Sequence, residues 1–140
     1  MHTPGHIALN ALEGLRISLE AIRSMNERAR ASGRDFAVLM LPTKESVFVR
    51  ALGDEIGRDS MVMSTLISRE NTVRERAIAF FEQHGIRWLD AREALSAAIL
   101  RGENPYFGDQ DGHPNPAGHR ILARLVASEL RARSGTEERR

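Results

Sequence analysis

The sequence predicts an α/β fold in which a parallel sheet of few strands is flanked by helices. Residues 35–43 and 86–90 have the length and composition of short strands. Each follows a helical pattern that ends at a glycine, and this repeat of helix, glycine and strand is typical of parallel sheets with helices packed on them. Because two parallel strands make a poor sheet, we expect the chain to form part of a larger sheet, or to complete its sheet with another chain.

The first two elements have the clearest patterns. Apolar residues recur at helical spacing over residues 8–32, and Gly33 is placed to end that helix. The residues that form this stripe are Leu12, Leu15, Leu19, Ile22 and Ala29. The continuous apolar run that follows, closed by Pro42, predicts a strand that is buried on both faces.

Residues 44–70 show no clean period. We expect one or two helical turns after Lys44 and then a loop with short helical pieces, which in a compact domain is often functional or mobile.

The next helix is predicted to begin at Thr72, which forms a capping-box pattern with Glu75. Gly85 ends this helix, and the second strand follows.

Two more helices complete the chain. Asp90 is the expected N-cap of the first, with Glu93 at the capping-box position three residues later. Asn115 is the expected N-cap of the last helix, with Pro116 at its first position. We predict a single domain over residues 1–132, followed by a frayed polar tail over 133–140.

The overall composition is that of an ordinary globular protein. The 140 residues carry 20 basic and 19 acidic side chains, and this balance argues against nucleic acid or an anionic membrane as a partner. The chain has no cysteine, so disulfides, thiolate zinc sites and cysteine nucleophiles are excluded. No apolar run approaches the roughly 20 residues of a membrane span, and the first residues lack a secretion signal, so we expect a soluble chain of unknown compartment.

Chemistry-bearing residues concentrate in "YFGDQDGHPNPAGHR", residues 106–120, just before the last helix. Loops of this kind lie beyond the carboxyl ends of the strands in α/β sheets, where functional groups gather. We expect Gly112 to permit a sharp turn that brings Asp111 to His113. A carboxylate on one imidazole nitrogen fixes the tautomer and leaves the other nitrogen free as a base. The alternative is an ordinary turn with an exposed histidine.

The stretch "DGHPNPAGHRILARLVASEL" resembles the last sequence block of the SGNH hydrolases, also called the GDSL esterase family. In that block an Asp and a His of a Ser-His-Asp triad precede "PN", a pair of small residues and the final helix. "FAVLMLPTKESVF" and "GIRWLDAREAL" are similar to the family's later strands, above all in its acyltransferase-like members, which include enzymes that O-acetylate polysaccharides. The resemblance covers residues 8–130. It implies part of a three-layer, flavodoxin-like sheet, with His113 as the catalytic base and Asp111 as its orienting acid.

The sequence departs from the family pattern in two places. The family's Asp more often lies three residues before the His, where this chain has Gln110; the acid is assigned to Asp111, with Asp109 as a substitute. The family's nucleophile lies in an early Gly-Asp-Ser block, which does not occur here. The resemblance therefore implies the second half of an SGNH domain, lacking the nucleophile; Ser60 is a possible replacement, or a plain loop serine.

Four more residues are candidates for roles in binding. Lys44 either contacts an anionic group of the substrate or is a surface lysine at a helix start. Tyr106 and Phe107 either form the wall of a pocket for an acyl or sugar group or pack under the loop. His119 is interpreted as a helix residue that faces solvent rather than as a metal ligand, and neither a metal nor a cofactor is predicted.

Two classes of function stay open. The first is an esterase or O-acyltransferase that acts on a small-molecule or carbohydrate acyl ester, with this chain supplying the His and Asp of the triad. The second is a non-catalytic α/β domain for binding or assembly that has lost the nucleophile block. We also expect a homodimer that pairs exposed sheet edges or apolar faces.

Overall fold

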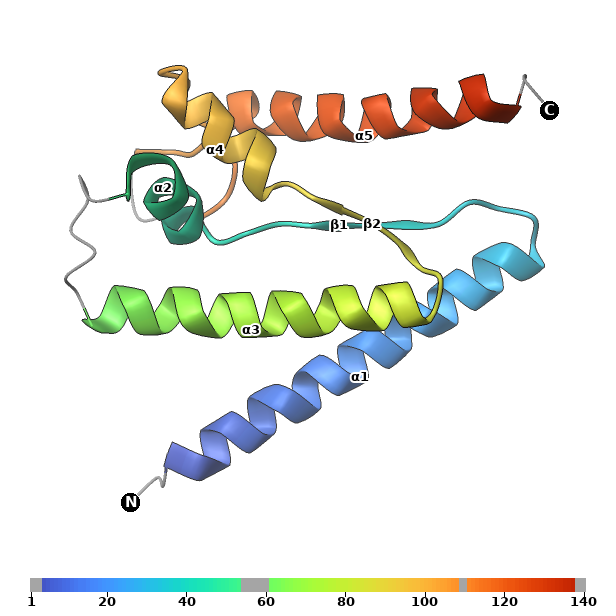
Figure 1. The fold of residues 1–140 in the computed structure, drawn as a ribbon, viewed down its shortest axis with the longest axis horizontal. Helices are drawn as coiled ribbons and strands as arrows, with labels where there is room; N and C mark the ends of the chain where they lie inside the picture. The colour runs from blue at the N-terminus through green and yellow to red at the C-terminus, as the bar shows by residue number, and fades with distance from the viewer. Residues whose placement is uncertain (1–3, 54–60, 109–110, 138–140) are drawn as a thin grey trace. The chain divides into compact units, whose positions relative to one another are not determined.

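The computed structural model describes residues 4–53, 61–108 and 111–137 (Figure 1). Within these ranges the elements are five helices and two strands. In chain order they are α1 (Pro4–Ala31), β1 (Ala37–Met40), α2 (Lys44–Leu52), α3 (Met61–Gln83), β2 (Arg87–Asp90), α4 (Arg92–Leu100) and α5 (Pro116–Glu137). The two strands pair in parallel, and the backbone N–H of Ala91 extends this pairing by donating to the carbonyl of Met40 at 3.1 Å. The predicted α/β class, with few strands and flanking helices, is confirmed.

The chain forms two compact units. One contains residues 1–38 and 71–88, and the other contains residues 39–70 and 89–140. The prediction of a single domain over 1–132 stays a prediction. The last helix runs to Glu137, so part of the segment that was predicted as a frayed tail is helical.

The first unit is built on α1 and on most of α3. Its buried apolar side chains are Leu19, Ala77, Phe81 and Ile86. Both of its helices end in the same way. Gly33 and Gly85 adopt left-handed backbone angles, with φ of 67° and 60°, as the sequence predicted.

A backbone hydrogen bond follows each of these glycines and leads the chain toward a strand. The N–H of Arg34 donates to Ala29 at 2.8 Å, and the N–H of Ile86 donates to Phe81 at 2.8 Å. These 6→1 bonds satisfy carbonyls at the ends of α1 and α3.

The second unit has its core around α4, which packs against both α2 and α5 (Figure 1). Its fully or nearly fully buried members are Val47, Ala91, Leu95, Ala98, Tyr106, Ile121 and Leu122. Burial of large apolar side chains such as Leu95 stabilises the unit by about 1.5–3 kcal/mol each.

The prediction for residues 44–70 was wrong in part. The short helix after Lys44 exists as α2, but α3 already begins at Met61, so Thr72 and Glu75 lie inside a helix and form no capping box. The first residues of α3, Met61 and Val62, are exposed. Because no apolar side chain of residues 61–70 is fully buried, this part of the helix carries only a weak 3.6-residue period.

Candidate active site at the entrance to the last helix

Asn115 holds the loop between α4 and α5 in place. Its side-chain amide donates to the carbonyls of Asn104 at 3.0 Å and Tyr106 at 2.8 Å, while its oxygen accepts from the N–H groups of Ala117 at 2.8 Å and Gly118 at 3.0 Å. The predicted N-cap is therefore confirmed. The same side chain also ties the loop to the helix entrance, which the sequence did not reveal.

Gly118 allows α5 to approach this loop closely. A Cβ at Gly118 would lie 2.3 Å from the carbonyl oxygen of Pro105 and 2.8 Å from Cβ of Pro114, distances at which atoms overlap. The backbone N–H of Asn115 donates to the same Pro105 carbonyl at 2.9 Å. The glycine at this position is thus required by packing, and it fixes the start of α5 against the loop that carries Asp111 and His113.

Asp111 and His113 contact each other at the tip of this loop. One carboxylate oxygen of Asp111, Oδ1, accepts the backbone N–H of His113 at 2.9 Å and lies 2.5 Å from Nδ1 of the same residue. Because a carboxylate only accepts, this contact places the proton on Nδ1 and leaves Nε2 without it in the neutral ring. Nε2 makes no hydrogen bond within the described residues. The predicted juxtaposition of the two side chains is therefore present in the structure.

The same contacts set the charge state of the acid. The backbone N–H of His113, followed by its ring, holds the pKa of the Asp111 carboxyl below its usual range. The positive charge of Lys44 acts in the same direction. Asp111 is therefore an anion at neutral pH, as an orienting acid must be.

Gly112 lies in the turn that brings Asp111 to His113, but the backbone there does not require a glycine. It lies outside the left-handed region of backbone angles, and a Cβ at this position would meet nothing within 4 Å. The turn between Asp111 and His113 is instead stabilised by the aspartate side chain, which accepts the N–H two residues on, as Asp does in many turns.

The pair faces solvent. The His113 side chain is 88% exposed and that of Asp111 is 43% exposed. The described residues thus bring Asp111 and His113 together, but they do not enclose them. Asp109 and Gln110 in the same loop, and Ser60, lie outside the described residues.

Lys44 links the loop to the carboxyl end of β1. It is the first residue of α2, and its Nζ donates to the carbonyls of Phe107 at 2.8 Å and Asp111 at 3.3 Å. The expectation of a helix-start lysine is confirmed, and the ammonium also holds the backbone of the candidate site. Contact with a substrate stays a prediction.

A partly buried carboxylate, Glu70, joins the starts of α2 and α4. It accepts from the hydroxyls of Thr43 and Ser46, the latter at 2.8 Å, and forms an ion pair with Arg92 at 3.1 Å. Thr43 in turn caps α2 by accepting the N–H of Ser46 at 3.3 Å. The sequence did not reveal this cluster because its members are far apart in the chain and belong to no motif.

Tyr106 packs under the loop, whereas Phe107 is exposed. The Tyr106 residue is 2% exposed, and its ring centroid lies 6.1 Å from that of Phe48. Burial, together with the negative charges of Glu70 and Glu45, raises the pKa of Tyr106 to about 12. Packing, and not a pocket wall, is the role that the structure supports for Tyr106.

The raised pKa of Tyr106 predicts a loss of stability at alkaline pH. The unfolded chain ionises this group near pH 10, whereas the folded chain keeps it neutral up to about pH 12. The stabilisation is therefore fully present below pH 10 and falls between pH 10 and 12, by about 2 kcal/mol for a shift of this size. Because the chain has a single tyrosine, the near-ultraviolet absorbance of tyrosinate reports Tyr106 alone.

The control for this titration is Glu70→Gln, which should lower the pKa of Tyr106 part of the way toward its ordinary value. A tyrosinate band that rises near pH 10, while circular dichroism still shows the native helices, would contradict the burial of this hydroxyl.

His119 lies on the exposed side of α5. The part of the chain that the structure describes contains no group of three or more His, Asp or Glu side chains that could hold a metal.

None of the described helices is both long and apolar enough to cross a membrane.

A comparison with protein families gives a match over nearly the whole chain. The family described as the SGNH hydrolase-like domain of the acetyltransferase AlgX matches residues 6–140. Comparisons with curated proteins and with solved structures gave no match. The resemblance found in the residues around Asp111 and His113 is confirmed, and the chain belongs to this SGNH hydrolase-like family.

Proposed function

We propose that this domain takes part in acyl transfer to or from an ester, as an esterase or O-acyltransferase, with His113 as the base and Asp111 as its orienting acid. One observation carries the proposal: the Asp111 carboxylate lies 2.5 Å from Nδ1 of His113, and the ring presents Nε2 to solvent. Membership of a family described as an acetyltransferase domain supports acyl chemistry, and it favours an acyl ester of a carbohydrate as the substrate.

In this proposal His113 moves one proton in each half of the reaction. Nε2 accepts the proton of a serine hydroxyl as the serine oxygen bonds to the acyl carbon, and it returns that proton to the alcohol oxygen as the ester C–O bond breaks. Water or a second hydroxyl then takes the acyl group by the same steps in reverse. Asp111 stays ionised and stabilises the imidazolium that forms between the two transfers.

The serine must come from elsewhere than the described residues. The chain contains no Gly-Asp-Ser, and no described serine hydroxyl bonds to His113. Ser46 is bound to Glu70, and Ser96 donates to the carbonyl of Val47. We propose that sequence outside these 140 residues supplies the nucleophile and the donors for the oxyanion.

The 140-residue chain alone is therefore expected to show little or no esterase activity, because neither nucleophilic attack nor oxyanion stabilisation is provided. A fluorophosphonate probe, which labels activated serines, tests this directly: the chain should stay unlabelled. Mass spectrometry that finds one uniquely labelled serine, Ser60 above all, would show that the chain carries its own nucleophile and would overturn this part of the proposal.

The exposure of His113 favours a second candidate function. A side chain that is 88% exposed and contacts no serine also fits an α/β domain that has kept the family's fold for binding or assembly alone. In that case His113→Ala would leave the function of the protein intact.

The edges of the two strands indicate how the chain could associate with further strands or with a second copy. Within the described residues each strand has a single neighbour, so one edge of β1 and one edge of β2 are unpaired. We propose that these edges pair with further strands of an SGNH-type sheet or with a second copy of the chain in a homodimer.

A further inference from the structure

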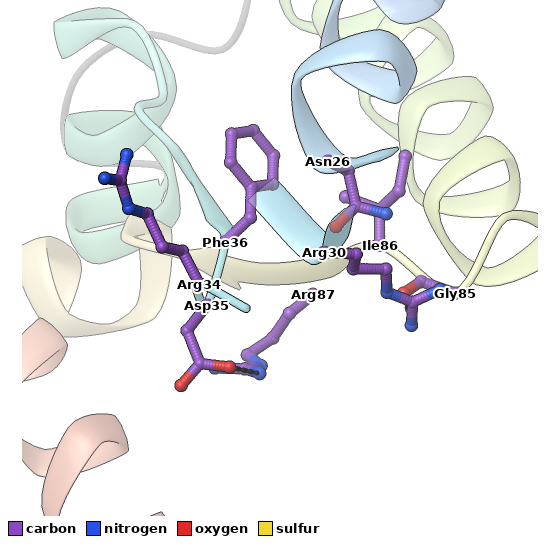
Figure 2. Close-up of a pocket in the computed structure, with 8 residues that line it drawn as sticks. All are labelled: Asn26, Arg30, Arg34, Asp35, Phe36, Gly85, Ile86 and Arg87. Carbon is purple, nitrogen blue, oxygen red and sulfur yellow. Dashed lines mark hydrogen bonds and ion pairs between the residues drawn. The ribbon is translucent and has the colours of Figure 1, made fainter. Parts of the chain in front are cut away.

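A pocket in the first unit contains a group of arginines that the candidate active site does not use. It lies where α1 and α3 end and the strands begin, and it has a volume of about 180 Å³. Its polar lining comes from Asn26, Arg30, Arg34, Asp35 and Arg87 (Figure 2). All of these residues belong to the same compact unit.

The charges in this pocket are unbalanced. Three arginines but only one carboxylate, that of Asp35, line the pocket, so positive charge is in excess. The ion pair between Arg87 and Asp35 spans 3.5 Å, and Arg30 reaches the carbonyl of Gly85 at 3.4 Å. Charge-assisted hydrogen bonds are usually about 2.7–2.9 Å long, so both contacts are weak. Most N–H donors of Arg30 and Arg87 have no acceptor among the described side chains and backbone.

Capping of the helix ends does not explain the arginines. The carbonyls of Arg30 and Glu82 already accept the N–H groups of Gly33 and Gly85, at 3.0 and 3.2 Å. The 6→1 bonds to Ala29 and Phe81 satisfy two more carbonyls. The carbonyls at the ends of α1 and α3 therefore need no guanidinium to replace a missing donor.

Asn26 adds an independent observation. This residue is only 5% exposed and lines the pocket, yet its side-chain amide makes no hydrogen bond within the described residues. Figure 2 shows the amide beside Arg30, next to Gly85 and Ile86, while the Arg34 guanidinium points away from them. Because this amide lines the pocket without a protein partner, its N–H groups are available to a ligand that accepts hydrogen bonds.

We propose that this pocket binds an oxyanion group, a phosphate or a carboxylate, held by Arg30, Arg87 and the Asn26 amide. The planar guanidinium offers two parallel N–H donors that match the spacing of two oxygens on either group. The Asn26 amide supplies a further donor from the buried wall. Arg34 lies at the rim, where its charge attracts the anion.

Nuclear magnetic resonance titration of the whole chain tests this assignment. Sodium phosphate and sodium acetate are added in separate series, with sodium chloride at equal ionic strength as the reference. We expect saturable shifts of the Asn26 side-chain amide and of the Gly85 backbone amide. Arg30→Gln and Arg87→Gln should each weaken binding about tenfold, the loss typical of one charge-assisted contact.

Arg101→Gln is the matched control. Arg101 also lies at a helix end, and its ion pair with Glu103 spans 4.0 Å. Its replacement removes the same charge from a residue that does not line the pocket. Binding should change less than about twofold. Arg30→Lys keeps the charge but not the paired donors and should bind more weakly than the wild type; it also serves as the test if a glutamine variant loses its native spectrum.

Saturation by phosphate alone identifies a phosphate ligand, and saturation by acetate alone a carboxylate ligand. Saturation by both supports the shared oxyanion chemistry. The proposal is overturned if neither salt shifts the Asn26 amide more than chloride does, or if Arg101→Gln weakens binding as much as Arg87→Gln.

Discussion

Replacing His113 with alanine is expected to lower acyl-ester turnover by about 10²- to 10⁴-fold, the usual contribution of a general acid–base group. The assay uses the full gene product with an acetyl ester, because the serine is supplied from outside the 140 residues in our proposal. The loss should appear in kcat, with KM nearly unchanged, since proton transfer occurs only in the transition state.

Two further variants distinguish a loss of catalysis from a non-specific loss of structure. Asp111→Asn removes the charge that orients the ring, so it should also lower kcat. His119→Ala removes an exposed imidazole from α5, one that makes no side-chain hydrogen bond or ion pair in the described part of the chain, and should change kcat less than twofold. Unchanged kcat in His113→Ala would favour the non-catalytic domain, and an equal loss in His119→Ala would show that the effect is not specific to the Asp111–His113 pair.

Replacing Gly118 with alanine is expected to destabilise the second unit by about 3 kcal/mol or more. In most helix interiors this change stabilises, by about 0.5–1 kcal/mol. Here the sign reverses because the new methyl group would lie 2.3 Å from the Pro105 carbonyl, whose backbone cannot retreat without breaking its bond to Asn115. Urea denaturation followed by circular dichroism measures the change in the free energy of unfolding.

Gly112→Ala is the matched control for this experiment, since a Cβ at position 112 meets nothing within 4 Å and the backbone there is not left-handed. Its free energy of unfolding should stay within about 0.5 kcal/mol of the wild type. If Gly118→Ala were as stable as the wild type, the close approach of α5 to the loop would be disproved.

Local signals in the sequence were enough to predict several features of the fold. The glycines at positions 33 and 85 marked the ends of α1 and α3 because glycine adopts the left-handed conformation that ends a helix more readily than any residue with a Cβ. Asn115 before Pro116 marked the start of α5, since an amide side chain can cap the first N–H groups and proline fits the first helical position. The first part of α3 was missed because periodicity reveals a helix only when one face is buried.

The candidate site was predictable only in part. Asp111 and His113 lie two residues apart, so their contact is local and could be anticipated. The roles of Gly118 and Glu70 could not, because they depend on Pro105 and on Arg92, which approach them only in the folded chain. The turn at Gly112 was anticipated, but the sequence did not reveal that the Asp111 side chain stabilises it without a special backbone conformation.

We propose that Asp111 fixes the ring of His113 with its proton on Nδ1 and with Nε2 open. Long-range proton–nitrogen magnetic resonance of the imidazole tests it most directly, with His113 assigned by comparison with His113→Ala. At a pH where the ring is neutral, we expect the Nδ1-protonated tautomer in the wild type and its loss in Asp111→Asn. A ring protonated on Nε2, or a tautomer that Asp111→Asn leaves unchanged, would contradict the proposed acid–base pair.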